Sequence, residues 1–348
     1  MIRIANWLLT RRCNLKCDYC AIVRDVANPD YKPISYFHSN EMSTQLVIET
    51  LEALKRHNPE MFHIFYGGEP FLRKDLADIV NFCNENEIEY TIITNNTKEI
   101  QPMIKKFFQK VDFVKGMTSS VDPVFDEDPY SEDRVRKSVE AILRLRELRE
   151  KGLVQDVVAE ITVLRNTQKK LIDVVSELSK YDICSSITFV DLKKNAYYDF
   201  SNVTDPELLV YKTPELSKVI CEILDDDSLY VHMKKTLLSL TFSILPSNHD
   251  CHIEDNLHNI TIDSDGSLRL CLRIRGMKCP SILVKDIFQE DSGDISEEVM
   301  GFVRSDKTNY CELCNHTCLI MSKLVDSVSS AVDELIHSDR RKGGKRNG

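Results

Sequence analysis

The feature that most constrains the fold is an alternation, up to about residue 192, between short apolar runs and longer amphipathic segments. The apolar runs have the length and composition of buried strands, whereas the amphipathic segments repeat apolar residues at helical spacing. The predicted strands are 4–10, 62–66, 89–94, 113–121, 157–164 and 186–192. The predicted helices between them are 42–54, with Ser43 as its cap, then 75–84, 100–108, 133–151 and 168–178. Strands joined through helices pair in parallel, so the sequence predicts an α/β fold. The fold is either a doubly wound sheet or a barrel, and in both cases ligands gather at the carboxyl ends of the strands.

Past residue 192 the rhythm changes, which predicts a different organisation. We expect a loop over 195–206 and helices over 214–224 and 229–244. Asp265-Gly266, between apolar runs at 259–263 and 267–272, indicates a hairpin turn. A last helix is expected over 319–336, before a basic, disordered tail. The predicted domains are a core at 1–195, a helical connector at 196–250, a cysteine-rich domain at 251–320, and a C-terminal helix with the tail at 321–348.

Composition narrows the class of protein. Hydrophobic residues make up 42% of the 348 residues, enough for a core and too many for a disordered chain. No apolar stretch is long enough to span a membrane, and the N-terminus lacks the pattern of a signal peptide, so we expect a cytoplasmic protein. The net charge of −10 disfavours general binding to phosphate backbones. Five basic residues in the last ten leave nucleic acid as a weakly supported partner.

Twelve cysteines in a chain without a signal peptide suggest metal ligands or reactive thiols rather than disulfides. Cys13, Cys17 and Cys20 follow the first predicted strand directly. A structural zinc site needs four ligands, and the first histidine downstream is His38. Three thiolates without a nearby fourth ligand leave one coordination position open, which favours a catalytic iron–sulfur cluster. A zinc site completed by a distant residue is the alternative.

The CxxxCxxC spacing, with Tyr19 before the last cysteine, resembles the signature loop of the radical S-adenosylmethionine (radical SAM) enzymes. In that family three cysteines hold a [4Fe–4S] cluster, and S-adenosylmethionine (SAM) chelates the fourth iron. The resemblance implies a partial (β/α)6 TIM-like barrel over residues 1 to about 192. It also implies that Cys13, Cys17 and Cys20 are the catalytic cluster ligands, with Tyr19 beside the cofactor.

Further motifs support the resemblance. Tyr66-Gly67-Gly68-Glu69-Pro70 follows the second predicted strand, where the family has its GGEP motif. There the glycines would let the backbone approach the cofactor, and Glu69 would accept from the methionyl ammonium. Four other residues follow later strands and are expected, by the resemblance, to bind SAM. They are Asn95 near the cofactor, Ser120 and Asp122 facing the ribose, and Arg134 facing the methionyl carboxylate.

The second cysteine zone resembles the shorter, twitch form of the SPASM extensions, which carry auxiliary iron–sulfur clusters. Cys251 and Cys271 flank the predicted hairpin, and a CxxC-x3-C run follows it. The expected ligands of an auxiliary [4Fe–4S] cluster are Cys251, Cys271, Cys311 and Cys314, with Cys318 as an alternate and Cys279 as the next candidate. A structural zinc site is the alternative, and His316 within the run is a candidate zinc ligand.

These features predict an enzyme that cleaves SAM reductively and abstracts hydrogen from an unactivated C–H bond of a small molecule or peptide side chain. The resemblance implies an electron donor such as flavodoxin or ferredoxin. Met1 lies three residues before the first predicted strand, so we expect no leader-binding domain ahead of the barrel. Radical modification of a nucleobase or nucleic acid is one alternative. A zinc-binding scaffold without catalysis is the other, but it would have no need for GGEP in register with CxxxCxxC.

Overall fold

The computed structural model describes residues 2–17, 20, 22, 33–121, 132–163, 168–189, 214–231 and 259–269. They build one eight-stranded sheet in the order β6-β5-β4-β3-β2-β1-β7-β8. The strands are β1 (Ile4–Thr10), β2 (Phe62–Gly67), β3 (Glu89–Thr94), β4 (Val114–Ser120), β5 (Val154–Val163), β6 (Cys184–Phe189), β7 (Asn259–Ile262) and β8 (Leu268–Arg269). All pairs are parallel except β7–β8. The α/β prediction is confirmed, with an open sheet that extends the expected six strands.

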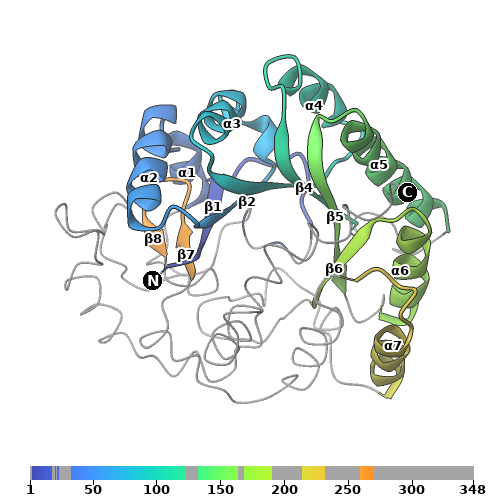
Figure 1. Cartoon of the computed structure of the whole chain (residues 1–348). Coiled ribbons are helices and arrows are strands. Elements are labelled where there is room, and N and C mark those ends of the chain that lie inside the picture. Colours follow the sequence, from blue (N-terminus) through green and yellow to red (C-terminus); the bar gives the residue numbers. More distant parts are fainter. Residues whose placement is uncertain are drawn as a thin grey trace, which may run out of the picture.

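Helices connect the parallel strands and pack along one side of the curved sheet (Figure 1). They are α1 (Ile34–Ser39), α2 (Thr44–His57), α3 (Leu76–Glu85), α4 (Gln101–Phe107), α5 (Glu132–Glu150), α6 (Leu171–Lys180) and α7 (Pro214–Asp225), with 3-10 turns at Pro70–Leu72 and Gln168–Lys170. The Ser43 side chain accepts from Leu46 N over 3.2 Å, which confirms the expected cap of α2.

The core lies between the strands and these helices. In β3 the buried residues Tyr90, Ile92 and Thr94 alternate with half-buried ones, as the two-residue period of a strand requires. Full burial of each large apolar side chain contributes about 1.5–3 kcal/mol. The helix-covered face therefore holds the sheet rigid while the carboxyl ends of the strands stay available for a site.

The β7–β8 hairpin is built by residues far from the core in sequence. Asp265-Gly266 makes the expected turn, with Gly266 N donating to Asp263 O over 2.9 Å. Strand β7 then pairs in parallel with β1, with Ile4 opposite Asn259 and Trp7 opposite Ile262. Strand β1 is thus an interior strand, and the hairpin adjoins the loop that follows it.

The helix expected over 229–244 does not begin there. Tyr230 O accepts from Ser185 N over 3.0 Å, and Val231 forms a parallel bridge with Ser185. Leu229 still belongs to the turn after α7, and Tyr230 and Val231 lie against β6, because the sheet edge supplies backbone partners that a helix would forgo. The rest of that range, and the expected elements at 195–206 and 319–336, lie outside the described residues. Among the described helices, none is long and apolar enough to cross a membrane.

Candidate cofactor site at the carboxyl ends of the strands

The cysteine loop begins where β1 ends. Cys13, Cys17 and Cys20 are all half-buried, and Cys20 N donates to Cys17 O over 3.0 Å. Burial raises the pKa of the Cys13 thiol. The Leu15 N–H, 3.4 Å from its sulfur, opposes that rise, while the charges of Glu69 and Cys20 add to it. A thiolate there is therefore unfavourable unless a cationic centre offsets the nearby negative charge.

The three sulfur atoms are not gathered in this structure. Over the described part of the chain, no three His, Cys, Asp or Glu side chains stand close enough to hold one metal ion. The loop therefore brings the three cysteines to one end of the sheet without closing them around a centre.

Gly67 and Gly68 end β2 against the backbone of this loop. A Cβ on Gly67, whose φ is +141°, would lie 2.3 Å from Thr10 O, and one on Gly68 would lie 2.1 Å from Arg12 O. The close approach allows Gly68 N and Glu69 N to donate to Thr10 O and Arg12 O, each over 2.7 Å. The lack of side chains on Gly67 and Gly68 thus lets the start of the cysteine loop lie against the end of β2. The sequence predicted instead that these glycines let the backbone approach the cofactor.

Glu69 is fully buried behind these glycines. Its Oε1 accepts from Thr94 Oγ1 over 3.0 Å and from Phe71 N over 3.1 Å, and its Oε2 accepts from Asn95 N over 2.8 Å. Burial raises its pKa to about 7, although these donors lower it. A carboxyl group whose pKa lies near neutral pH would ionise when a ligand cation binds beside it.

Asn95 joins the end of β3 to the cysteine loop. Its Nδ2 donates to Asn14 Oδ1 over 2.8 Å and lies 3.7 Å from Cys13 Sγ. Asn14 in turn donates to Thr97 Oγ1 over 2.9 Å. Asn95 is therefore placed beside a predicted cluster ligand as well as beside Glu69.

Its neighbour Asn96 has a different place. It is buried in the left-handed region at φ +48°, and its Nδ2 donates to Ser119 Oγ and Ala141 O. Asn96 thus fixes the turn after β3 from within the core.

The remaining predicted SAM-binding residues are less fully placed. Ser120 ends β4, half-buried and opposite Glu160 of β5, and β3 lies between β4 and β2, the strand that Glu69 follows. Arg134 lies in α5, but its side chain is outside the described residues, as are Tyr19 and Asp122. The predicted auxiliary ligands Cys251, Cys271, Cys311, Cys314 and Cys318, with Cys279 and His316, also lie outside them.

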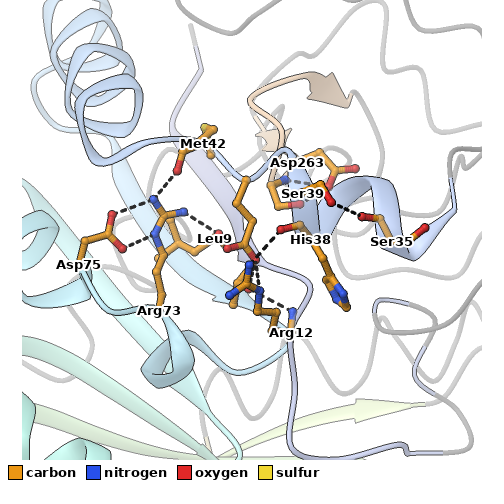
Figure 2. A network of polar contacts seen from close by, with 12 residues as sticks. Leu9, Arg12, Ser35, His38, Ser39, Met42, Arg73, Asp75 and Asp263 are labelled. Atoms are coloured by element: carbon orange, nitrogen blue, oxygen red, sulfur yellow. Dashed lines mark hydrogen bonds and ion pairs between the residues drawn. The ribbon is translucent and has the colours of Figure 1, made fainter.

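Sequence reasoning did not single out the arginines near the site, of which Arg73 is one. The side chain of Arg73 is 4% exposed and pairs with both Asp75 oxygens, at 2.8 and 2.9 Å. It also donates to Leu9 O over 2.8 Å and to Met42 O over 2.6 Å, so it ties the end of β1 to the start of α2 (Figure 2). The sequence offers little signal for this role, because Arg73 stands next to Lys74 and Asp75 in a charged run that follows Leu72.

Arg12, the second arginine, is half-exposed beside the loop. It donates to His38 O over 2.9 Å and approaches Glu41 Oε1 at 3.5 Å, and Thr10 Oγ1 also donates to Glu41 (Figure 2). These contacts tie the start of the cysteine loop to α1 and the segment that follows it.

Comparison with known proteins agrees with the fold. A family model described as Radical SAM superfamily matches residues 7–178. The fold is similar to the crystal structure of Streptococcus suis SuiB bound to S-adenosylmethionine, with a TM-score of 0.61 at 14% identity over 94% of this chain and 75% of that chain. The chain therefore carries a radical SAM domain over residues 7–178.

Two curated relatives show how far the similarity extends. Fe-coproporphyrin III synthase of Methanosarcina barkeri is 34% identical over 104 residues, which are 30% of this chain and 23% of that protein. GTP 3',8-cyclase of Clostridium botulinum is 22% identical over 276 residues, 76% of this chain and 79% of that protein. The chain spans less than two fifths of the first curated relatives it matches.

Proposed function

We propose that this protein cleaves SAM reductively at a [4Fe–4S] cluster and abstracts hydrogen from an unactivated C–H bond of a small molecule or peptide side chain. The observation that carries the proposal is the convergence of the cysteine loop, Glu69 and Asn95 at the ends of β1, β2 and β3. Asn95 links the two other parts, because its main chain donates to Glu69 and its side chain lies beside Cys13.

The donor set fits an iron–sulfur cluster. Cys13, Cys17 and Cys20 supply three soft thiols, and the Asn95 amide offers Cys13 Sγ a hydrogen bond of the kind that tunes such clusters. When bound, the cluster supplies the electron that splits SAM into methionine and a 5′-deoxyadenosyl radical. We expect the three sulfur atoms to draw together on binding, since the cluster would also offset the charges that raise the pKa of Cys13.

The chain's own residues would position SAM. Glu69 would accept from the methionyl ammonium, because a cation at that buried carboxyl favours its ionised form at neutral pH. Ser120 and Asp122 would bind the ribose, Arg134 would pair with the methionyl carboxylate, and Tyr19 would flank the cluster. Gly67 and Gly68 support the site indirectly, by letting β2 lie against the start of the cysteine loop.

The C-terminal cysteines extend the proposal. Cys251, Cys271, Cys311 and Cys314, or Cys318 in place of one of them, would hold an auxiliary [4Fe–4S] cluster in a twitch-like domain. A flavodoxin or ferredoxin would deliver the electron. The β7–β8 hairpin supports this placement, since it precedes Cys271 in the chain and pairs with β1 beside the cysteine loop.

Metal analysis tests the proposal. The protein is purified anaerobically, and iron, sulfide and zinc are counted per chain in the wild type and in a Cys13/Cys17/Cys20→Ala variant. We expect about eight irons falling to about four, together with loss of 5′-deoxyadenosine formation from SAM and dithionite. About four irons falling to none would remove the auxiliary cluster only. Zinc without iron after anaerobic reconstitution would refute the radical mechanism and support a zinc scaffold.

A nucleotide is a second candidate substrate, because the similarity to GTP 3',8-cyclase covers 76% of this chain. If it is correct, GTP should raise the rate of 5′-deoxyadenosine formation above the rate with SAM alone. A rate unchanged by GTP, with ATP as the matched control, would remove this candidate.

A further inference from the structure

The start of the cysteine loop is tied to the β7–β8 hairpin by a buried ion pair. Arg11 Nε and Nη2 donate to Asp263 Oδ1 and Oδ2 over 3.0 and 2.7 Å, a bidentate arrangement. The two side chains are 2% and 1% exposed. The two residues are 252 positions apart in the sequence, so the contact joins the first and last described segments of the chain.

Arg11 and Asp263 each make further contacts that hold their side chains in place. The Arg11 guanidinium lies 4.2 Å from the ring centre of Phe37 in α1. Asp263 Oδ1 also accepts from Ser264 N over 2.7 Å, within the tight turn of the hairpin. The hairpin is itself anchored, because Met42 N donates to Ser264 O over 2.7 Å. The carboxylate therefore stands in a fixed position, and the guanidinium has little freedom to leave it.

The remaining Arg11 contact reaches the far end of the cysteine loop. Arg11 Nη1 donates to Ile22 O over 2.9 Å. Arg11 precedes Cys13 by two residues, and Ile22 follows Cys20 by two residues. One guanidinium thus closes the loop that carries all three cysteines, while its other edge binds the hairpin.

We propose that Arg11 and Asp263 are positioning residues that close the cysteine loop and fix it to the β7–β8 hairpin. The geometry of the catalytic cluster then depends on residues 259–269 as well as on β1. This inference rests on the proposed function, since it concerns the position of the proposed cluster ligands. The groups that orient metal ligands typically change metal affinity or activity about 10- to 100-fold when they are removed.

The test separates positioning from folding. Arg11→Met/Asp263→Leu replaces the pair by apolar side chains, a change that often leaves stability intact. Arg11→Lys keeps a charge opposite Asp263 but loses the planar guanidinium that reaches both Asp263 and Ile22. The control is Lys180→Met/Glu177→Leu, which removes an exposed pair on α6. Each protein is compared by thermal unfolding and by hydrogen exchange of the 11–22 segment without metal. The reconstituted proteins are compared by iron content and by the EPR spectrum of the reduced cluster with and without SAM.

We expect both Arg11 variants to exchange the 11–22 amides faster than wild type, and to hold the cluster or SAM about 10- to 100-fold more weakly. The EPR spectrum should change in both Arg11 variants, even in a variant whose unfolding temperature equals that of wild type. The Lys180→Met/Glu177→Leu control should match wild type. Wild-type exchange and a wild-type EPR spectrum in a folded Arg11→Lys protein would overturn the inference and leave the proposed function standing. A wild-type protein that binds no cluster and leaves SAM intact would instead refute the proposed function.

Discussion

The main-chain N–H of Asn95 donates to Oε2 of Glu69 over 2.8 Å, so the end of β3 holds the carboxylate that follows β2. Thr94 and Phe71 supply two further donors to the same group. A buried carboxylate whose two oxygens accept from three donors is fixed in direction. Its remaining acceptor capacity is therefore available to a ligand.

Substitution of Glu69 should weaken SAM binding more than cluster assembly. Glu69→Gln is nearly isosteric but removes the charge, and a hydrogen bond to a charged group contributes about 1.5–3 kcal/mol. We expect a Kd for SAM about tenfold higher or more, with iron content close to wild type. Equilibrium binding of SAM to the reconstituted protein measures this. Glu89→Gln, which changes a half-buried carboxylate of β3 paired with Lys115, is the matched control. Equal SAM affinities in wild type and Glu69→Gln would exclude the proposed role.

The Asn95 side chain should tune the potential of the cluster. Its amide lies 3.7 Å from Cys13 Sγ, and a donor at a ligating sulfur stabilises the more negative, reduced state. Asn95→Ala should lower the reduction potential, and Asn95→Asp should lower it further by adding a negative charge. A redox titration followed by EPR measures both shifts. Asn81→Ala, which removes an exposed amide that donates to Lys110 O, should leave the potential unchanged. A higher potential in Asn95→Ala would contradict the assigned contact.

Gly68→Ala should disrupt the cysteine loop. The new methyl group would lie 2.1 Å from Arg12 O, and backbone cannot move aside as a flexible side chain can. We expect a loss of about 1–3 kcal/mol in the free energy of unfolding, the range for overpacking, together with loss of iron. Urea unfolding and iron analysis measure the two effects. Gly152→Ala is the control, since its Cβ would meet nothing within 4 Å and only its φ of +74° is strained. Retention of iron in Gly68→Ala would show that the contact can relax.

Acid should destabilise the fold through His63. This residue is buried and accepts from Trp7 Nε1 over 3.0 Å, and burial lowers its pKa to about 3 from the usual 6.5. Between pH 6.5 and 3 the unfolded chain binds a proton that the folded chain does not. The free energy of unfolding should therefore fall as pH decreases, by up to about 1.4 kcal/mol per pH unit from this group.

His63→Gln keeps an acceptor for Trp7 without a titrating ring, so its stability should depend less on pH over that interval. Trp7 is the only tryptophan in the chain, so urea unfolding followed by its fluorescence reports this region directly. Parallel pH profiles for wild type and His63→Gln would argue against a folded-state pKa well below 6.5.

Much of the core could be predicted from local sequence pattern. The bounds of β1 and β3 match the expected ranges exactly, because each is a short apolar run ended by polar residues. The helix α1 was missed because it has only six residues and no side-chain cap. The expected cluster of Glu69 and Asn95 follows from parallel strands, whose carboxyl ends share one edge.

Contacts between distant segments could not be predicted in the same way. The register of β7 against β1 and the pairing of Arg11 with Asp263 depend on tertiary packing, which no local period encodes. The tight approach of Gly68 to Arg12 likewise depends on how β2 ends beside β1. Sequence therefore predicts candidate groups for the site, while the structure shows the contacts that orient those among the described residues.

The pairing of β7 with β1 has a consequence for how the protein is made. At a synthesis rate of 5–20 residues per second, residue 4 leaves the ribosome on the order of ten to fifty seconds before its partner, residue 259. During that interval one edge of β1 is open, and an open edge can pair with another chain. A nascent chain that has reached residue 178, where the family match ends, would hold the cysteine loop but lack the strand that covers this edge. The last described segment is thus a protecting element for the first, and it is synthesised long after the strand that it protects.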